Sequence, residues 1–123
     1  MGAENALVIS SDDISKKSYI EFFETYGCQW YSGHKDEAII LDEHTQVGVC
    51  LMDSSYSEMF DKGDQSEFEV ALGAKPKSYF EVNRTKADDP DDLYLVVARE
   101  MAKKWRVAVY DIQEKMIPYD ALV

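Results

Sequence analysis

The side chains of this chain that could bind a metal or take part in catalysis are its histidines, its cysteines and its clustered carboxylates. The two histidines, His34 and His44, lie in charged turns at opposite ends of one predicted strand. A rise of about 3.3 Å per residue keeps them too far apart to share a metal ion. The cysteines, Cys28 and Cys50, stand singly in separate apolar segments, without the base and the electropositive setting that a cysteine nucleophile needs. We therefore expect two free, buried thiols and no catalytic residue.

The carboxylates are densest in the stretch MDSSYSEMFDKGDQSEFEV, residues 52–70. Acids at Asp61, Asp64 and Glu67 superficially suggest a calcium loop. However, Gly63 stands at the third position counted from Asp61, whereas an EF-hand loop has its glycine at the sixth. The sequence also contains no glycine-rich phosphate loop, nucleophile elbow or H-E-x-x-H motif. We predict that the chain has no metal site, takes no cofactor and is not an enzyme.

Negative charge is concentrated in one part of the chain. The 123 residues carry a formal net charge of −11, and the window from Asp36 to Glu69 holds ten carboxylates with a single base, Lys62. A chain this acidic is poorly suited to bind nucleic acid or anionic lipid directly, because both need lysine and arginine at the contact. It suits a basic protein partner, since complementary charge steers association.

Aromatic residues interleaved with these acids have the composition of a protein-binding surface. A solvated connecting loop whose aromatic residues point inward is the competing interpretation. We also include Tyr31, which alternates with Trp30 on a predicted strand and is the one expected to face outward. The predicted partner-binding residues are Asp53, Tyr56, Glu58, Asp61, Asp64, Glu67 and Tyr31.

Hydrophobic spacing indicates which elements position these residues. Strands are predicted at residues 5–10, 28–32, 38–42, 46–53, 66–72, 78–84 and 106–113. Helices are predicted over residues 13–26 and from Asp89 to Trp105, where Asp89 caps the helix and Pro90 takes its first position. A short helix is predicted over residues 54–63. Residues 66–72 and 78–84 alternate apolar and polar side chains around a proline turn, which predicts a hairpin. The last ten residues form either a short edge segment or a cover over the sheet.

This order of elements predicts a single α+β domain over residues 1–123. We expect one mostly antiparallel (mixed) sheet of six to seven strands with two main helices packed on it. The sequence has no run of about 18 apolar residues and no signal-peptide pattern at its start, so we expect a cytoplasmic protein that does not enter membranes. The oligomeric state stays open.

The acidic single-domain α+β profile and the run ALGAKPKSYFEVNRTK…LYLVVAREMAKKWRVAVYDIQ resemble immunity proteins of bacterial polymorphic-toxin and contact-dependent growth inhibition systems. The resemblance implies a protein that neutralises one cognate toxin domain, often a basic nuclease, by covering its active site or another essential surface. It carries no site residues over to this chain. A general acidic interaction or DNA-mimic module, and a small metal-binding protein or enzyme, remain the alternatives.

Overall fold

The structure, a computed structural model, describes residues 5–41, 46–84, 93–110 and 116–123. Its strands are β1 (Asn5–Ser10), β2 (Gln29–Trp30), β3 (Ala38–Leu41), β4 (Gln46–Leu51), β5 (Ser78–Arg84), β6 (Val107–Tyr110) and β7 (Met116–Ile117). Its helices are α1 (Lys16–Tyr26), the 3₁₀ helix η1 (Ser54–Met59), α2 (Lys62–Leu72), α3 (Leu93–Ala102) and α4 (Tyr119–Leu122). The strands form one antiparallel sheet in the order β2-β3-β4-β5-β1-β6-β7, which confirms the predicted α+β class.

Helix α1 begins and ends close to where the sequence predicts. Ser15 accepts a hydrogen bond from the backbone N–H of Ser18 as an N-cap, and Gly27 ends the helix with φ 105°, a left-handed conformation that favours glycine. Tyr19 then ties the helix to the sheet, because its hydroxyl donates to the Val49 carbonyl at 2.5 Å and accepts from the Ala38 N–H at 3.1 Å. The helix predicted over residues 13–26 is therefore confirmed, except that residues 13–15 precede α1.

The predicted pairing of the third and fourth strands is also confirmed. Ala38 faces Val49 and Leu41 faces Gln46 across the antiparallel β3–β4 pair, whose connecting residues 42–45 lie outside the described part of the chain. Strand β5 pairs with β4 on one side and with β1 on the other.

The strand predicted over residues 66–72 is wrong, since these residues belong to α2. The strand pattern put Phe68, Val70 and Leu72 on one face, but the structure buries Phe68 and Leu72 and leaves Val70 84% exposed. Helical geometry explains this, because residues four apart share a face and residues two apart do not. Upstream, Asp61 and Asp64 form a capping box that starts the helix, a signal that outweighs a short run of alternating side chains.

The C-terminal third follows the prediction where it is described. Helix α3 and strand β6 lie within the segments predicted as helix and strand, while the predicted cap at Asp89 and Pro90 falls in residues 85–92, outside the described residues. Strand β7 pairs with β6 at the sheet edge and α4 follows it, so residues 116–123, the described part of the last ten, supply both an edge segment and a cover.

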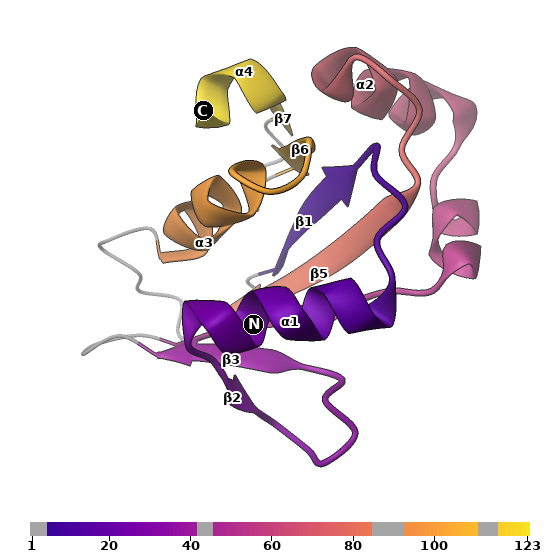
Figure 1. Ribbon diagram of the computed structural model, residues 1–123. Coiled ribbons are helices and arrows are strands. Elements are labelled where there is room, and N and C mark those ends of the chain that lie inside the picture. Colours follow the sequence, from indigo (N-terminus) through magenta and orange to yellow (C-terminus); the bar gives the residue numbers. More distant parts are fainter. Residues whose placement is uncertain (1–4, 42–45, 85–92, 111–115) are drawn as a thin grey trace.

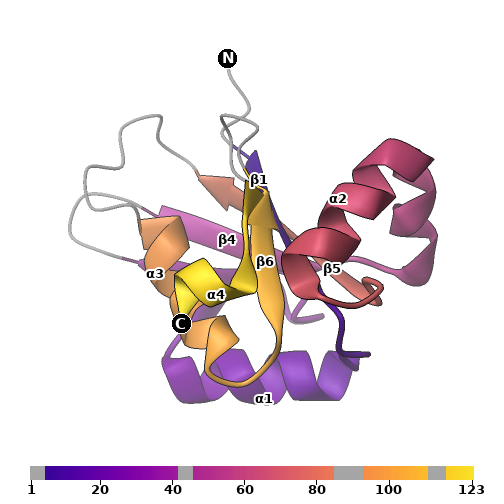
Figure 2. The same ribbon diagram turned by 90° about the horizontal axis from the view of Figure 1, so that it is seen from above.

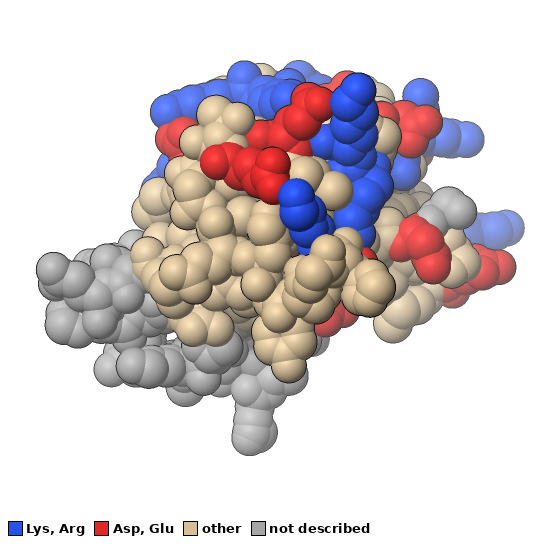
Figure 3. Space-filling view, turned by 60° about the horizontal axis from the view of Figure 1, so that its bottom comes forward, with Lys and Arg blue, Asp and Glu red and all other residues tan. Residues whose placement is uncertain are grey.

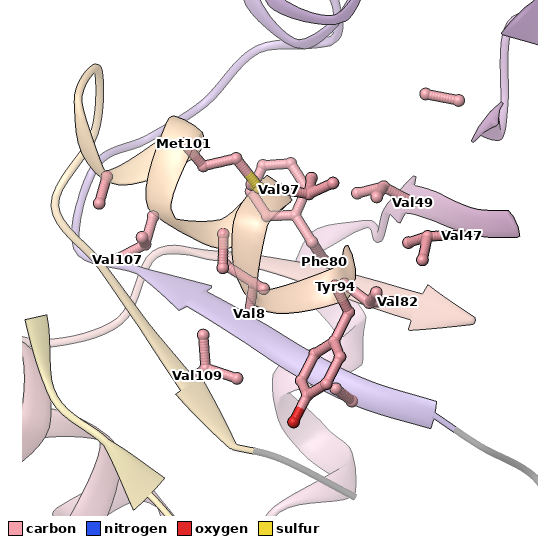
Figure 4. Packing of buried hydrophobic residues seen from close by; sticks show 14 of the residues in the cluster. Val8, Val47, Val49, Phe80, Val82, Tyr94, Val97, Met101, Val107 and Val109 are labelled. Carbon is pink, nitrogen blue, oxygen red and sulfur yellow. The ribbon is translucent and has the colours of Figure 1, made fainter. Parts of the chain in front are cut away.

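Helices cover both faces of the sheet, as Figures 1 and 2 show for α3 and α4 on one side and α2 on the other. The larger hydrophobic cluster joins the sheet to α1, α3 and α4. Within it, Met101 of α3 and Phe80 of β5 point toward each other, and both are fully buried (Figure 4). The smaller cluster joins β1, β5 and β6 to α2, with Tyr56 and Phe60 of the η1 region packed against it. The predicted two-helix arrangement thus gains α2 on the opposite face.

Candidate functional site

The segment with most of the predicted partner-binding residues forms a helical layer of its own, η1 followed by α2. Aromatic side chains attach it to the sheet. The Phe60 ring stacks on Tyr79 with centroids 5.8 Å apart, and Phe68 meets Phe60 edge-on at 5.1 Å. Tyr56 is half-buried, and its hydroxyl donates to Glu81 at 3.4 Å. Burial, followed by the charge of Glu81, raises the pKa of Tyr56. Phe60 and Phe68 therefore hold the layer to the sheet, and Tyr56 is only partly available to a partner.

Three of the predicted carboxylates hold this layer together. Asp53 caps η1, accepting from both the backbone N–H and the hydroxyl of Ser55, and these hydrogen bonds lower the pKa of Asp53. Asp61 accepts from the Asp64 N–H at 2.8 Å, and Asp64 reaches back to the Asp61 N–H at 3.4 Å. These capping contacts alone explain why aspartates stand at positions 53, 61 and 64, so a binding role is not needed to account for Asp53, Asp61 and Asp64.

The remaining acids of the layer point outward. Glu58 and Glu67 are exposed, and no hydrogen bond or ion pair to another described residue engages them. Glu69, which the sequence analysis counted only as part of the acidic window, is exposed as well. We define the η1–α2 surface by its exposed charged and large apolar residues, which are Asp53, Glu58, Met59, Asp61, Lys62, Glu67, Glu69 and Val70.

Tyr31 does not join this surface. It is 78% exposed, as predicted, while its neighbour Trp30 packs against the core. Tyr31 directly follows β2 at one edge of the sheet, whereas α2 contacts β1, β6 and β7 toward the other edge. The two predicted parts of the interface lie at opposite ends of the molecule (Figure 1).

The acidic window of the sequence is likewise divided in space. Asp36, the first acid of the window, pairs with Lys16 at 2.8 Å. Glu24, which lies outside the window, pairs with Lys35 at 2.7 Å near β2. Lysine contacts lower the pKa of both carboxylates. On the face drawn in Figure 3, red acidic and blue basic atoms are interspersed. Charge in this region is mixed, so it is less suited to a basic partner than the η1–α2 surface.

Sequence reasoning missed a row of polar groups on the part of the sheet that lies beside η1. Cys50 of β4 faces Glu81 of β5, and Glu37 lies over Gly48, where it accepts a hydrogen bond from Asn83 at 3.3 Å. A Cβ at Gly48 would overlap with the Glu37 carboxylate. Gly48 within a strand was the available signal, since a glycine inside a strand often marks a bulge or a close approach.

This row does not make a reactive thiol. Burial, followed by the charges of Glu37 and Glu81, raises the pKa of Cys50 to about 12, so the thiol stays protonated near neutral pH. Both cysteines are free, and both are half-buried rather than fully buried as expected. In the described ranges, no group of three or more His, Cys, Asp or Glu side chains is placed to hold a metal ion.

Two grooves border the outer helices. One, of about 620 Å³, lies between α2 and the β7–α4 segment and is lined by Ser66, Glu67, Val70, Ala71, Met116 and Pro118. The other, of about 450 Å³, lies between α3 and α4 and is lined by Val96, Arg99, Glu100, Lys103, Leu122 and Val123. The first opens onto the η1–α2 surface, and the second lies on the opposite side of the sheet.

Comparison with known proteins gave no relative: no family model, curated protein or solved structure matches this chain. Among the helices that the structure describes, none has the length and apolar character needed to cross a membrane.

Proposed function

We propose that this chain is a small acidic binding protein, and specifically an immunity protein that neutralises a cognate basic toxin domain. The observation that carries the proposal is the η1–α2 surface, which combines exposed carboxylates with two exposed apolar side chains, Met59 (70%) and Val70 (84%). Apolar contacts ringed by charge are the usual composition of a protein-binding patch. The narrower identity, an immunity protein, rests on the sequence resemblance.

Electrostatics give the surface a role in association. The chain's net charge of −11 attracts a basic partner, and Glu58 and Glu67 concentrate that attraction on one side of the molecule. Such complementary charge raises association rates and makes them depend on salt. A nuclease toxin has a basic groove for its nucleic acid, which an acidic helical layer of this kind can cover.

The first test identifies the partner. The tagged chain is recovered from its native host, and bound proteins are identified by mass spectrometry. We expect one basic toxin domain, encoded next to this chain, with a Kd in the nanomolar range or below that weakens as salt increases. Several unrelated basic partners, displaced by DNA, would favour the general acidic module instead. Recovery of no toxin domain, from a gene that stands alone among metabolic genes, overturns the immunity function.

The second test locates the interface. The charge-reversal pair Glu58→Lys/Glu67→Lys avoids the capping residues Asp53, Asp61 and Asp64, so the fold stays intact. Binding should weaken by about tenfold to a hundredfold at low salt. The matched control, Asp13→Lys/Glu21→Lys, changes net charge equally at exposed positions in and before α1. Equal losses from both pairs would mean that only the total charge matters and would remove the interface from η1–α2.

A further inference from the structure

The groove beside α2 has one wall from a helix and the other from the chain's C-terminal segment. Ser66 and Val70, four residues apart, line it from α2, together with Glu67 and Ala71. Met116 of β7 and Pro118, which precedes α4, form the opposite wall. Figures 1 and 2 show α2 and α4 standing on either side of β7. The groove is shallow, open and largely apolar.

Val70 is the most exposed of the large apolar side chains that the structure describes. It forms a ridge, because a second hollow of about 420 Å³, lined by Ser66, Glu69, Val70 and Gly73, lies on its other side. A β-branched residue at an exposed helix position contributes neither to the core nor to helix propensity. Most of its apolar surface is therefore available to a partner.

The charged residues that line the groove and the hollow beside it are acidic. Glu67 and Glu69 line the two hollows beside Val70, and neither hollow is lined by a lysine or arginine of the described chain. Arg106 lies close to both hollows without lining them. Its guanidinium lies over the Tyr119 ring at 4.4 Å, donates to the Leu72 carbonyl at the end of α2, and would meet a Cβ added at Gly73. The α3–α4 groove differs, since Arg99 and Lys103 line it.

We propose that the α2 groove receives an apolar side chain carried by a basic amphipathic segment of the partner protein. The apolar side chain packs between Val70 and Met116, and flanking lysines or arginines lie against Glu67 and Glu69. This assignment rests on the proposed function, which it deepens by naming the anchoring position and the chemistry of the segment that occupies it. Val70 supplies the contact area, and the carboxylates supply the selectivity for a basic segment.

A synthetic probe tests the groove without the natural partner. It is a peptide of leucine and lysine with the leucines at helical spacing, and it is titrated into the isotopically labelled full chain. We expect chemical-shift changes at the amides of Ser66, Val70 and Met116. A peptide of leucine and glutamate with the same spacing, and a scrambled leucine–lysine peptide, should bind much more weakly. Shift changes confined to the α3–α4 groove, or equal binding of the three peptides, overturn the assignment.

Two valine variants separate apolar contact from charge. Val70→Ser removes the ridge without altering charge, and Val96→Ser makes the same change at an exposed position of α3 that lines the other groove. We expect Val70→Ser to weaken leucine–lysine peptide binding by about fivefold to tenfold, and Val96→Ser to change it less than twofold. Both variants should unfold at nearly the wild-type temperature, which excludes misfolding as the cause. Equal effects of the two variants overturn the role of Val70.

The same variants, tested on the natural partner, distinguish the two proposals. If Glu58→Lys/Glu67→Lys weakens that complex while Val70→Ser leaves it unchanged, the acidic surface stands and the groove assignment fails. If Val70→Ser weakens the complex by the same fivefold to tenfold, the groove assignment is supported. If the recovered partner is not a toxin domain, the immunity function fails, and the peptide titration still decides what the groove binds.

Discussion

The two helical layers of this molecule are built on different physical principles. Among the described residues, twenty-one buried side chains join α1, α3 and α4 to one sheet face, whereas seven join α2 to the other. A large buried apolar surface holds the first layer to the sheet. The second is held by a capping box, a 3₁₀ cap and a small group of stacked aromatic rings.

The residues that stabilise the fold are therefore largely different from those that form the η1–α2 surface. The layer of α1, α3 and α4 is called the α1–α3 layer below. Because apolar burial is the dominant favourable term in folding, this layer contributes most of the free energy of unfolding. The outer side of the η1–α2 layer can then change composition without loss of the fold. Exposed carboxylates and an exposed valine on a helix are tolerated there because the opposite face supplies the core.

The largest expected effect is a truncation in the larger cluster. Phe80 is fully buried and stacks on Trp105, so Phe80→Ala should lower the free energy of unfolding by about 3–5 kcal/mol. Phe68→Ala removes an equally buried ring from the smaller cluster, where η1 and α2 can move inward to fill part of the cavity, and should cost less. Urea denaturation measures both. A larger loss from Phe68→Ala would reverse the assignment of stability to the α1–α3 layer.

Loss of a helix cap should affect the second layer alone. Asp61→Ala removes the side-chain oxygen that accepts from the Asp64 N–H, and we expect it to cost about 1 kcal/mol. Amides of α2 should then exchange hydrogen faster, while those of α1 keep their wild-type rates. Glu67→Ala, an exposed substitution within α2 that removes no cap, is the control and should change stability by less than about 0.5 kcal/mol. Faster exchange throughout the molecule would show that the two layers open together.

The contrast between the layers also explains what could be predicted from the sequence. Positions whose environment is set locally were predictable, such as Gly27 at the end of α1 and the apolar face of α3 with Val97 and Met101. Residues 66–72 were not, because alternation over seven residues fits a strand as well as one helix face. The capping box at Asp61 and Asp64 was visible in the sequence, but those acids were interpreted as part of a binding surface.

The sequence predicted which segment carries the candidate site, but not which residues lie together on one surface. Glu58 and Glu67 are exposed as a binding role requires, yet Tyr31 lies at the far edge of the sheet because strand order depends on long-range pairing. Val70 was hidden by the strand interpretation, which turned it inward. The groove between α2 and Met116 brings together residues 46 positions apart, and no local pattern encodes that contact.

Alkaline pH should weaken the fold through Cys50. Its pKa in the folded chain is about 12 against an ordinary value of 9.0, because burial and the charges of Glu37 and Glu81 disfavour the thiolate. The unfolded chain therefore ionises first, so this contribution to stability is complete below pH 9 and is lost as pH rises toward 12. Cys50→Ala should flatten the fall in stability across that range, measured by denaturation at several pH values. An unchanged slope would mean that the buried tyrosines account for it.

Only a small effect on stability is expected at Gly48, on the part of the sheet beside η1. In Gly48→Ala the new methyl group displaces the Glu37 carboxylate, a flexible chain end, so the free energy of unfolding should change by less than about 1 kcal/mol. The hydrogen bond from Asn83 is lost, and Cys50 no longer faces the Glu37 charge, so the pKa of the thiol should fall toward its ordinary value. Thiolate absorbance during an alkaline titration reports that pKa.

Glu37→Gln is the matched control for this effect, because it removes the charge and leaves Gly48 in place. It should lower the pKa of Cys50 in the same direction as Gly48→Ala. If Gly48→Ala instead unfolds the protein, the close approach at residue 48 is essential to the sheet itself. The part of the sheet beside η1 would then contribute to stability as the α1–α3 layer does. Residues that stabilise the fold would in that case also lie on the η1–α2 side of the sheet.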